Sequence, residues 1–280
     1  MRCIVKDYII ELNNLTFKYS DGTKAINNLN LKIERGKKIS FLGINGAGKS
    51  TLFLHLNGIL KPTKGEILFN RVPLKYSHKE LKKIRQKVGI VFQDPDTQLF
   101  SANVYQEVSF GAMNLNLEKA EVKRRVDKAL EDTNVFDFKD KPTHFLSYGQ
   151  KKRVSIADIL VMEPEVIILD EPTSSLDPKH SAMIEGLLND INKTGATLLL
   201  STHDIDFAYS WSDYIFILKN GELIGEGTPE EVFENDHWID AGAIEKPLVF
   251  EVYKALKAKD LIHDDIVPRN KKELLKLIGT

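Results

Sequence analysis

The sequence predicts an α/β fold: a mixed core with an N-terminal antiparallel β subdomain, an inserted helical subdomain and a C-terminal helical extension. Three observations favour this class. The first third alternates short β-rich runs with turns, and residues 104–162 are largely helical in pattern. Buried strand-like runs then return at 165–169 and 196–200, separated by a helical stretch. At 280 residues, the chain is long for one compact domain but short for two complete ones.

The N-terminal third supplies most of the predicted strands. These short β-rich runs are 8–12, 15–19, 29–33, 38–42 and 65–69. Ser77 and Glu80 then have the spacing of a capping box, so a helix is expected to begin at this point. The highly charged run 118–134 carries an incomplete apolar stripe and is expected to be a helix of the inserted subdomain.

The last part of the chain is predicted to complete the core and then extend beyond it. A helix over 179–193 joins the two buried strands, and a hairpin is expected around the Asn-Gly turn at 220–221. Thr228 and Pro229 have the residue types of an N-cap and a first helical position. Two weaker helical stretches follow, at 247–257 and 271–278.

Residues 43–51 read GINGAGKST and match the phosphate-binding pattern G-x-x-x-x-G-K-[ST] at every specified position. The glycines permit a tight turn whose N–H groups point inward around an anion. Lys49 adds a charge that can reach the β- and γ-phosphates, and the Ser50 hydroxyl can ligate Mg²⁺. A strand-like run precedes this loop and a helical run follows it, which favours a true nucleotide site over a flexible glycine loop. The expected ATP-binding residues here are Gly43, Asn45, Gly46, Ala47, Gly48, Lys49, Ser50 and Thr51.

Composition excludes several classes of function. The formal net charge of −1 gives no global basic field, so nucleic acid is not an expected partner. No run approaches the roughly 18 apolar residues that span a bilayer, and charge interrupts the N-terminus too early for a secretory signal. The single cysteine, Cys3, cannot form an internal disulfide. We therefore expect a cytoplasmic location, with any membrane role arising only through partners.

Residues 166–171 read VIILDE, four apolar residues ending in two carboxylates. In a protein with a phosphate loop, a buried strand that ends in aspartate supports Mg²⁺, usually through water, and Asp170 has this position. Glu171 is placed to accept a proton from the attacking water or to orient it. An apolar strand ending in acids is by itself most often a strand edge, but the phosphate loop favours the nucleotide site.

Three further motifs point to a family. Residues 170–178 read DEPTSSLDP, residues 146–150 read LSYGQ, and residues 201–204 read STHD. Together with the phosphate loop they resemble the ATP-binding subunits of ABC transporters, in the same order and spacing, over roughly residues 8–235. The resemblance implies a P-loop NTPase core over 1–235. The helical subdomain, at about 94–162, would carry the signature motif of the family, which corresponds to residues 146–150. Residues 236–280 would form the C-terminal extension.

The resemblance also assigns roles within one chain's nucleotide site. Tyr19 is similar to the aromatic residue that stacks on adenine. Gln93 resembles the glutamine that contacts Mg²⁺ and the attacking water, and His203 resembles the switch histidine that contacts the γ-phosphate. With Glu171 as the catalytic carboxylate, the implied Mg²⁺ ligands are Ser50, Gln93 and Asp170. Each of these residues alone has an ordinary packing or surface role as its alternative.

The signature motif implies that a complete site needs two chains. In the family, the residues equivalent to Ser147 and Gly149 touch the γ-phosphate bound by the opposite subunit, and Asp177 matches a loop that crosses the interface. We therefore expect a head-to-tail dimer that closes on ATP and opens after hydrolysis. One departure stands out, because Tyr148 replaces the first glycine of Leu-Ser-Gly-Gly-Gln. Activity is expected to survive if the backbone φ of Tyr148 is negative.

Residues 91–100 and 104–111 look like the corresponding region of the ATPases of energy-coupling-factor importers, which import vitamins or transition-metal ions. In that family, this region helps form a groove for a coupling helix of the transmembrane partner; the alternative is ordinary packing within the helical subdomain. The expected groove residues are Leu99, Phe100, Val104 and Phe110, with Asp94 and Asp96 at the rim. Residues 211–213 and the C-terminal extension look like the cobalt- or nickel-type branch.

The sequence thus predicts an ATP-hydrolysing, energy-coupling subunit of an importer for cobalt or nickel ions, using ATP and Mg²⁺. The alternatives are an importer of a vitamin or another small molecule, or a non-transport ATPase of the same superfamily. A metabolic kinase would lack the signature motif. The expected partners are a transmembrane coupling subunit, a substrate-binding membrane subunit, and a second copy or a paralogous ATPase. The chain would lie peripherally on the cytoplasmic face of the cell membrane.

Overall fold

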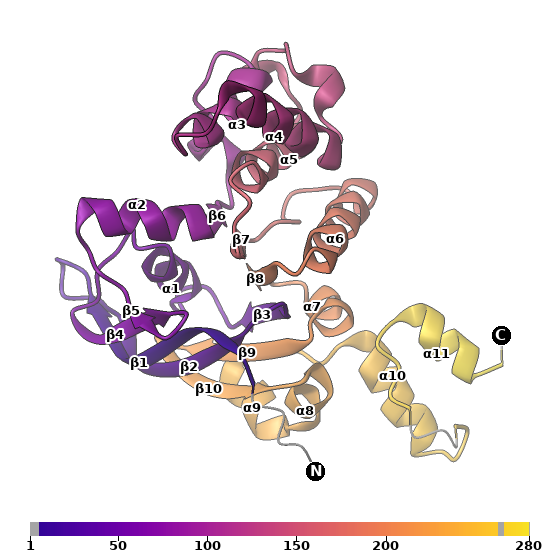
Figure 1. Ribbon diagram of the computed structural model, residues 1–280. Coiled ribbons are helices and arrows are strands. Elements are labelled where there is room, and N and C mark those ends of the chain that lie inside the picture. Colours follow the sequence, from indigo (N-terminus) through magenta and orange to yellow (C-terminus); the bar gives the residue numbers. More distant parts are fainter. Residues whose placement is uncertain (1–5, 263–265, 280) are drawn as a thin grey trace.

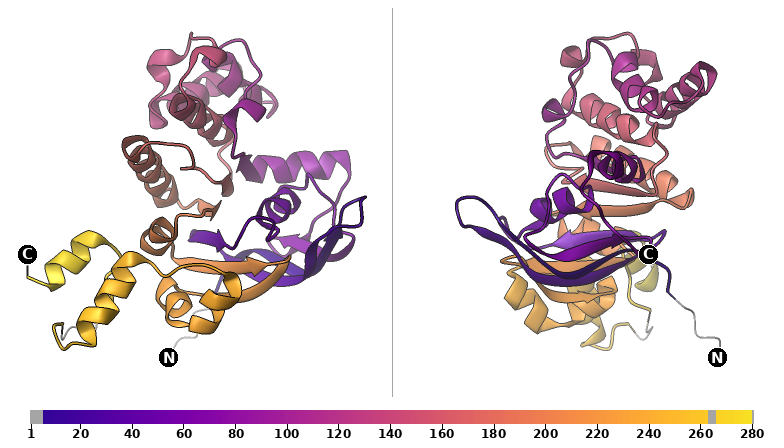
Figure 2. Two further views of the ribbon diagram at one scale, coloured as in Figure 1. Left: turned by 180° about the vertical axis from the view of Figure 1, so that it is seen from behind. Right: turned by 60° about the vertical axis from the view of Figure 1, so that its left-hand side comes forward.

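The computed structural model describes residues 6–262 and 266–279, so Cys3 lies outside the described residues. Figure 1 shows two sheets in the body of the molecule, a helical subdomain above them and two C-terminal helices to one side. The rear view in Figure 2 shows the C-terminal helices leaving the body on the side away from the antiparallel sheet. The predicted α/β fold with an antiparallel β subdomain and a helical insertion is confirmed.

The larger sheet provides the edge on which the site is built. Its neighbouring strands are parallel, except that β10 forms an antiparallel hairpin with β9. In the order in which they lie side by side, the described strands are β10 (Glu222–Gly227), β9 (Tyr214–Lys219), β3 (Lys38–Leu42), β8 (Thr197–Ser201), β7 (Val166–Asp170) and β6 (Val88–Val91). The inner strands are apolar and buried because helices cover both faces of a parallel sheet. The residues that follow β3, β7 and β8 therefore emerge at the same edge.

The smaller sheet is antiparallel in the described residues, and it shows one error in the prediction. Its strands lie in the order β2 (Lys24–Glu34), β1 (Tyr8–Lys18), β4 (Lys64–Phe69) and β5 (Val72–Pro73). The two predicted strands at 8–12 and 15–19 are one strand, β1. The register of β1 with β2 shifts between Leu12 and Leu15, and Asn14 has a φ of +50°. Asparagine tolerates this left-handed conformation, so a β-bulge accommodates the polar residues at this point, and β1 continues to pair with β2 beyond it.

Helices on the core carry the chain between strands. They are α1 (Lys49–Leu56), α2 (His78–Lys87), α6 (Pro178–Lys193) and α7 (Ile205–Trp211). The Ser77 hydroxyl caps α2 by accepting the Glu80 N–H at 3.4 Å. The other half of the expected capping box is replaced by an ion pair, because the Glu80 carboxylate lies 2.8 Å from the Lys83 ammonium. An oppositely charged neighbour three residues along the helix competes with the backbone N–H for this carboxylate.

The helical subdomain is built on its own small core. It contains α3 (Val104–Met113), α4 (Lys119–Asp132) and α5 (Tyr148–Leu160), with short 3₁₀ turns at Pro95–Thr97, Phe136–Phe138 and Thr143–Phe145. Val108, Val126, Leu130 and Val154 are fully buried together between the three helices. The predicted apolar stripe of α4 is therefore the face that packs inward. At the start of α5, Ser147 and Gln150 form a complete capping box.

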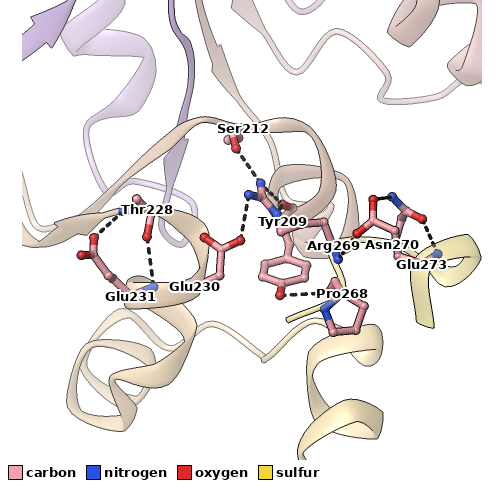
Figure 3. A network of polar contacts seen from close by, with 9 residues as sticks. All are labelled: Tyr209, Ser212, Thr228, Glu230, Glu231, Pro268, Arg269, Asn270 and Glu273. Carbon is pink, nitrogen blue, oxygen red and sulfur yellow. Dashed lines mark hydrogen bonds and ion pairs between the residues drawn. The ribbon is translucent and has the colours of Figure 1, made fainter. Parts of the chain in front are cut away.

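The C-terminal part comprises α8 (Pro229–Glu234), α9 (Asp236–Gly242), α10 (Leu248–Lys257) and α11 (Lys271–Leu277). Figure 3 shows how Arg269 fastens it to the core. The guanidinium donates to the backbone carbonyls of Tyr209 and Ser212, at 2.8 and 2.6 Å, and pairs with Glu230 at 2.9 Å. The Tyr209 hydroxyl donates in turn to the Pro268 carbonyl. Arg269 thus caps the carbonyl end of α7, where a cation is electrostatically favourable.

The division of the chain at residue 235 remains a proposal. Beyond it, Ile239 of α9 and Phe250 of α10 are buried in one cluster with Tyr209 and Ile217 of the core. At least the first part of the proposed extension therefore shares an apolar core with the larger sheet. Among the described helices, none combines the length and apolar character needed to cross a bilayer.

Candidate nucleotide site

The phosphate loop connects β3 to α1 and turns sharply at its glycines. Gly43 and Gly48 have φ values of +139° and +102°, conformations that L side chains rarely adopt. A Cβ on Gly43 would lie 2.2 Å from the Leu218 carbonyl oxygen, and one on Gly48 would lie 2.6 Å from that of Ala25. Backbone therefore packs against backbone on the outside of the loop, and the N-terminus of α1 faces the pocket.

Lys49 is the first residue of α1 and is almost fully buried. Its ammonium donates to the carbonyls of Gly43 and Ile44, at 2.6 and 3.3 Å, so the side chain folds back along its own loop. Burial lowers the pKa of Lys49, and the nearby carboxylates of Glu171 and Asp170 oppose this effect. A buried cation next to inward-facing N–H groups is suited to bind an anion with several charges.

Two carboxylates emerge from the end of β7. Asp170 of β7 lies opposite Ser201 of β8, and the Ser201 hydroxyl donates to the Asp170 carboxylate. The same hydroxyl accepts the Glu171 N–H at 3.1 Å. Glu171 itself has a φ of +47°, so the chain turns abruptly after the strand and directs this side chain back over the edge. Ser201 therefore fixes both acids, a role that sequence reasoning missed although Ser201 belongs to a quoted motif.

Glu171 has the environment of a general base. Its carboxylate is buried and lies 3.2 Å from Nε2 of the half-exposed His203. Burial raises the pKa of Glu171, while His203 and Lys49 oppose this change. A carboxylate with a pKa nearer neutrality accepts a proton from water more effectively than an ordinary one.

These groups line one cavity of about 320 Å³. Tyr19 stands at its rim, 39% exposed, with its hydroxyl 3.0 Å from the Thr51 hydroxyl. The exposed Gln93 reaches it from the segment that follows β6. The structure thus brings together the predicted residues Tyr19, Asn45, Gly46, Ala47, Gly48, Lys49, Ser50, Thr51, Gln93, Asp170, Glu171 and His203. Gly43, the first residue of the loop, does not line the cavity.

Ser147, Gly149 and Asp177 do not line this cavity. Ser147 caps α5, and a Cβ on Gly149 would lie 3.2 Å from the His180 ring, so the position favours a small residue. Asp177 caps α6, and hydrogen bonds from His180 lower the pKa of the Asp177 carboxyl. The structure thus places these three residues outside the cavity that the rest of the predicted nucleotide site forms. Tyr148 is the first residue of α5 and has no positive φ, which satisfies the condition set for replacing the glycine.

The oxygen donors in the pocket fit Mg²⁺. The ion typically keeps several waters and takes one or two protein oxygens, with the remainder from substrate phosphates. The exposed Ser50 hydroxyl and the Asp170 carboxylate, which the Ser201 hydroxyl orients, supply such oxygens next to the phosphate loop. We propose that they hold Mg²⁺, which would neutralise phosphate charge when bound.

Fold and pocket together define a class: α/β ATPases with a phosphate-binding loop and an inserted helical subdomain. The family profile described as ABC transporter matches residues 26–174. The chain is 50% identical to the energy-coupling factor transporter ATP-binding protein EcfA3 of Clostridium perfringens, over 91% of this chain and 90% of that protein. It is 49% identical to a putative ABC transporter ATP-binding protein of Methanosarcina mazei, over 95% of this chain but only 59% of that longer protein.

Solved structures similar to this chain indicate the same family as the sequence relatives. CbiO1 of Clostridium perfringens, described as part of the ABC transporter complex CbiONQ, matches with a TM-score of 0.76 and 52% identity, over 84% of this chain and 94% of that one. A dimeric ATP-binding cassette bound to ADP and Pi after hydrolysis matches with a TM-score of 0.72 and 31% identity, over 79% of this chain and 98% of that one. The chain therefore belongs to the ABC transporter family, among the ATP-binding proteins of energy-coupling-factor transporters. It binds ATP, and its ATPase activity is coupled to transport.

Proposed function

We propose that this chain powers an energy-coupling-factor importer for cobalt or nickel ions, from the cytoplasmic face of the cell membrane. The observation that carries the enzymatic part is the single cavity containing the phosphate loop, Asp170, Glu171 and His203. The residues at 211–213, which look like the cobalt- or nickel-type branch, support the metal ion as substrate. An importer of a vitamin or another small molecule is the second candidate, favoured by the general energy-coupling-factor names of the relatives.

Within this proposal, the chain's own residues bind and orient ATP. Lys49 and the N–H groups of the phosphate loop neutralise the phosphates, and Tyr19 stacks on the adenine. Glu171 accepts a proton from the attacking water, and His203, which already lies against it, contacts the γ-phosphate. Because phosphoryl transfer requires little covalent chemistry from a protein, positioning and charge account for most of the catalysis.

The place of the signature motif supports dimerisation. Ser147 and Gly149 lie outside the cavity of their own chain. The capping box uses the N–H groups of Ser147 and Gln150, so a phosphate brought by another molecule would bind at the N–H groups of Tyr148 and Gly149. We propose a head-to-tail pair, either two copies or one copy with a paralogous ATPase. The dimeric cassette that holds ADP and Pi supports this arrangement by likeness.

The membrane partner is proposed to dock on the helical subdomain. Phe100 and Phe110 are 68% and 54% exposed, and their rings meet edge to face at 5.0 Å. Met113 lies one turn further along α3 and is also exposed. The predicted contact through Val104 is wrong, because Val104 is fully buried against α4 and α5. Leu99 is half-buried. The Asp96 carboxylate pairs with the Lys151 ammonium at 2.6 Å, whereas the exposed Asp94 carboxylate accepts the Asp96 N–H at 3.0 Å. Asp94 is therefore the better placed of the two acids to meet a basic residue of the partner.

Phe110→Ser tests this docking surface. We expect the variant to bind ATP but to lose most co-purification with a coupling subunit encoded beside it, since an aromatic anchor at an interface contributes about 2 kcal/mol or more. Val72→Ser is the matched control, because Val72 is 62% exposed on β5, away from the helical subdomain. Capture of Phe110→Ser at the wild-type level would contradict the docking surface.

The transported substrate is tested separately. Vesicles containing the purified complex should take up Co²⁺ or Ni²⁺ with ATP, and uptake of a vitamin instead would establish the second candidate.

A further inference from the structure

The first turns of α5 hold the segment that contains Gln93. We define the glutamine loop as residues 92–98, between β6 and the helical subdomain. The Lys152 ammonium donates to the carbonyls of Phe92 and Gln93, at 3.1 and 2.5 Å, and the Tyr148 hydroxyl donates to the same Gln93 carbonyl at 3.1 Å. Tyr148 and Lys152 are four residues apart and therefore lie on one face of α5. The Gln93 carbonyl thus accepts hydrogen bonds from two side chains of α5, the helix that begins at the signature motif.

Further contacts fasten the rest of the loop to α5. The Gln98 side chain accepts the Phe92 N–H at 3.2 Å and donates to the Ser155 carbonyl at 3.0 Å. The Lys151 ammonium pairs with Asp96 at 2.6 Å. The loop is therefore attached to α5 at its beginning, in its middle and at its end.

The burial of Lys152 indicates that these contacts are specific. Its side chain is fully buried, and burial lowers the pKa of Lys152 to about 8, although the nearby acids Asp170, Asp94 and Glu171 oppose this change. A buried ammonium is costly unless hydrogen bonds satisfy it, so the two loop carbonyls are required partners. The ammonium also lies 5.9 Å from the centre of the Tyr148 ring, within the range of a cation–π contact.

Tyr148 occupies the position at which the signature motif usually has glycine. Glycine has no side chain with which to reach the glutamine loop, so the contact to the Gln93 carbonyl exists because of this substitution. Since Tyr148 adopts a helical conformation without a positive φ, the substitution strains nothing in the backbone. The departure from the family pattern therefore adds a contact at no conformational cost.

We propose that Tyr148 and Lys152 are positioning residues that hold the backbone of Gln93, so that this glutamine follows the movement of α5. The inference rests on the proposed function, in which α5 of one chain contacts the γ-phosphate in the other chain's site. Closure of one site then moves α5, and the same movement sets Gln93 in the second site. The two sites of a dimer are linked through a path contained within each chain.

A double-mutant cycle tests this proposal in the purified full chain. Tyr148→Phe removes only the hydroxyl and should lower kcat about fivefold, as expected for one lost hydrogen bond, with the KM for ATP nearly unchanged. Lys152→Met should have a larger effect in the same direction. In a Gln93→Ala background, neither change should lower kcat further, because both act through that glutamine. Both single variants should also need more Mg²⁺ for half-maximal activity.

Tyr105→Phe is the control, because Tyr105 lies on α3, partly buried against the core of the helical subdomain, and this variant should keep wild-type kcat. An equal loss from Tyr148→Phe with and without Gln93 would overturn the proposal, and so would an unchanged kcat. Tyr148→Gly, which restores the usual glycine, should behave like Tyr148→Phe; a kcat above wild type would also overturn it. Failure of the proposed two-chain function would give a different result from failure of this inference. The chain would stay monomeric with ATP, whatever the double-mutant cycle shows.

Discussion

Glu171→Gln should bind ATP with near wild-type affinity while hydrolysing it about 10² to 10⁴ times more slowly. The amide keeps the shape of the side chain but cannot accept the proton of the attacking water, and loss of a general base costs rates of this order. Steady-state ATPase assays give the rate and calorimetry gives the affinity. Because hydrolysis is what would reopen the dimer, this variant should also accumulate the closed, ATP-bound pair.

The control for this prediction is Glu131→Gln, which removes one carboxylate from the exposed face of α4 and should leave the rate unchanged. A Glu171→Gln variant that hydrolyses ATP at even a tenth of the wild-type rate would rule out Glu171 as the principal base. The pair of Glu171 with His203 would then be a structural contact only.

Lys49→Ala should lose most of its affinity for ATP. The ammonium is nearly buried and adjoins the loop N–H groups, so its removal deletes a charge-assisted contact of about 3 kcal/mol, or roughly a hundredfold in Kd. Calorimetric titration with ATP measures this loss directly. The carbonyls of Gly43 and Ile44 would lose their donor as well, which should loosen the loop.

A control variant and a test of folding are needed to interpret the affinity of Lys49→Ala. Lys64→Ala removes an exposed lysine of β4 and should leave the affinity for ATP unchanged. The thermal midpoint of Lys49→Ala shows whether the variant is folded. A folded Lys49→Ala chain with wild-type affinity would contradict the assignment of the phosphate loop.

The sequence was most informative where chemistry demands particular residues. The phosphate loop could be predicted because only glycine fits at Gly43 and Gly48, where other backbone carbonyls approach closely. Asp170 could be placed at a sheet edge because an apolar run before it indicates a buried strand. The capped helix at Thr228 was equally readable, and the structure contains its complete capping box.

Features that depend on long-range packing could not be predicted. Nothing local to β1 shows that pairing with β2 and β4 continues through the bulge at Asn14. The burial of Val104 depends on how α3 packs against α4 and α5. The helix α9 was not predicted, since its seven residues are too few for a clear periodic pattern. Ser201 and Lys152 act through partners some thirty or more positions away in the chain, so their contacts became visible only in the fold.

Chemical cross-linking tests most directly the claim that a second chain completes the site. Asn45→Cys would be introduced into one preparation and Ser147→Cys into another, both in a Cys3→Ser and Glu171→Gln background, because Cys3 is the only native cysteine. A short bismaleimide is then added to each preparation alone and to their mixture, with and without ATP. The account predicts a covalent dimer in the mixture with ATP and little in either preparation alone. A mixture with ATP that remains monomeric, or that cross-links no more than the separate preparations, would contradict completion of the site by a second copy of this chain.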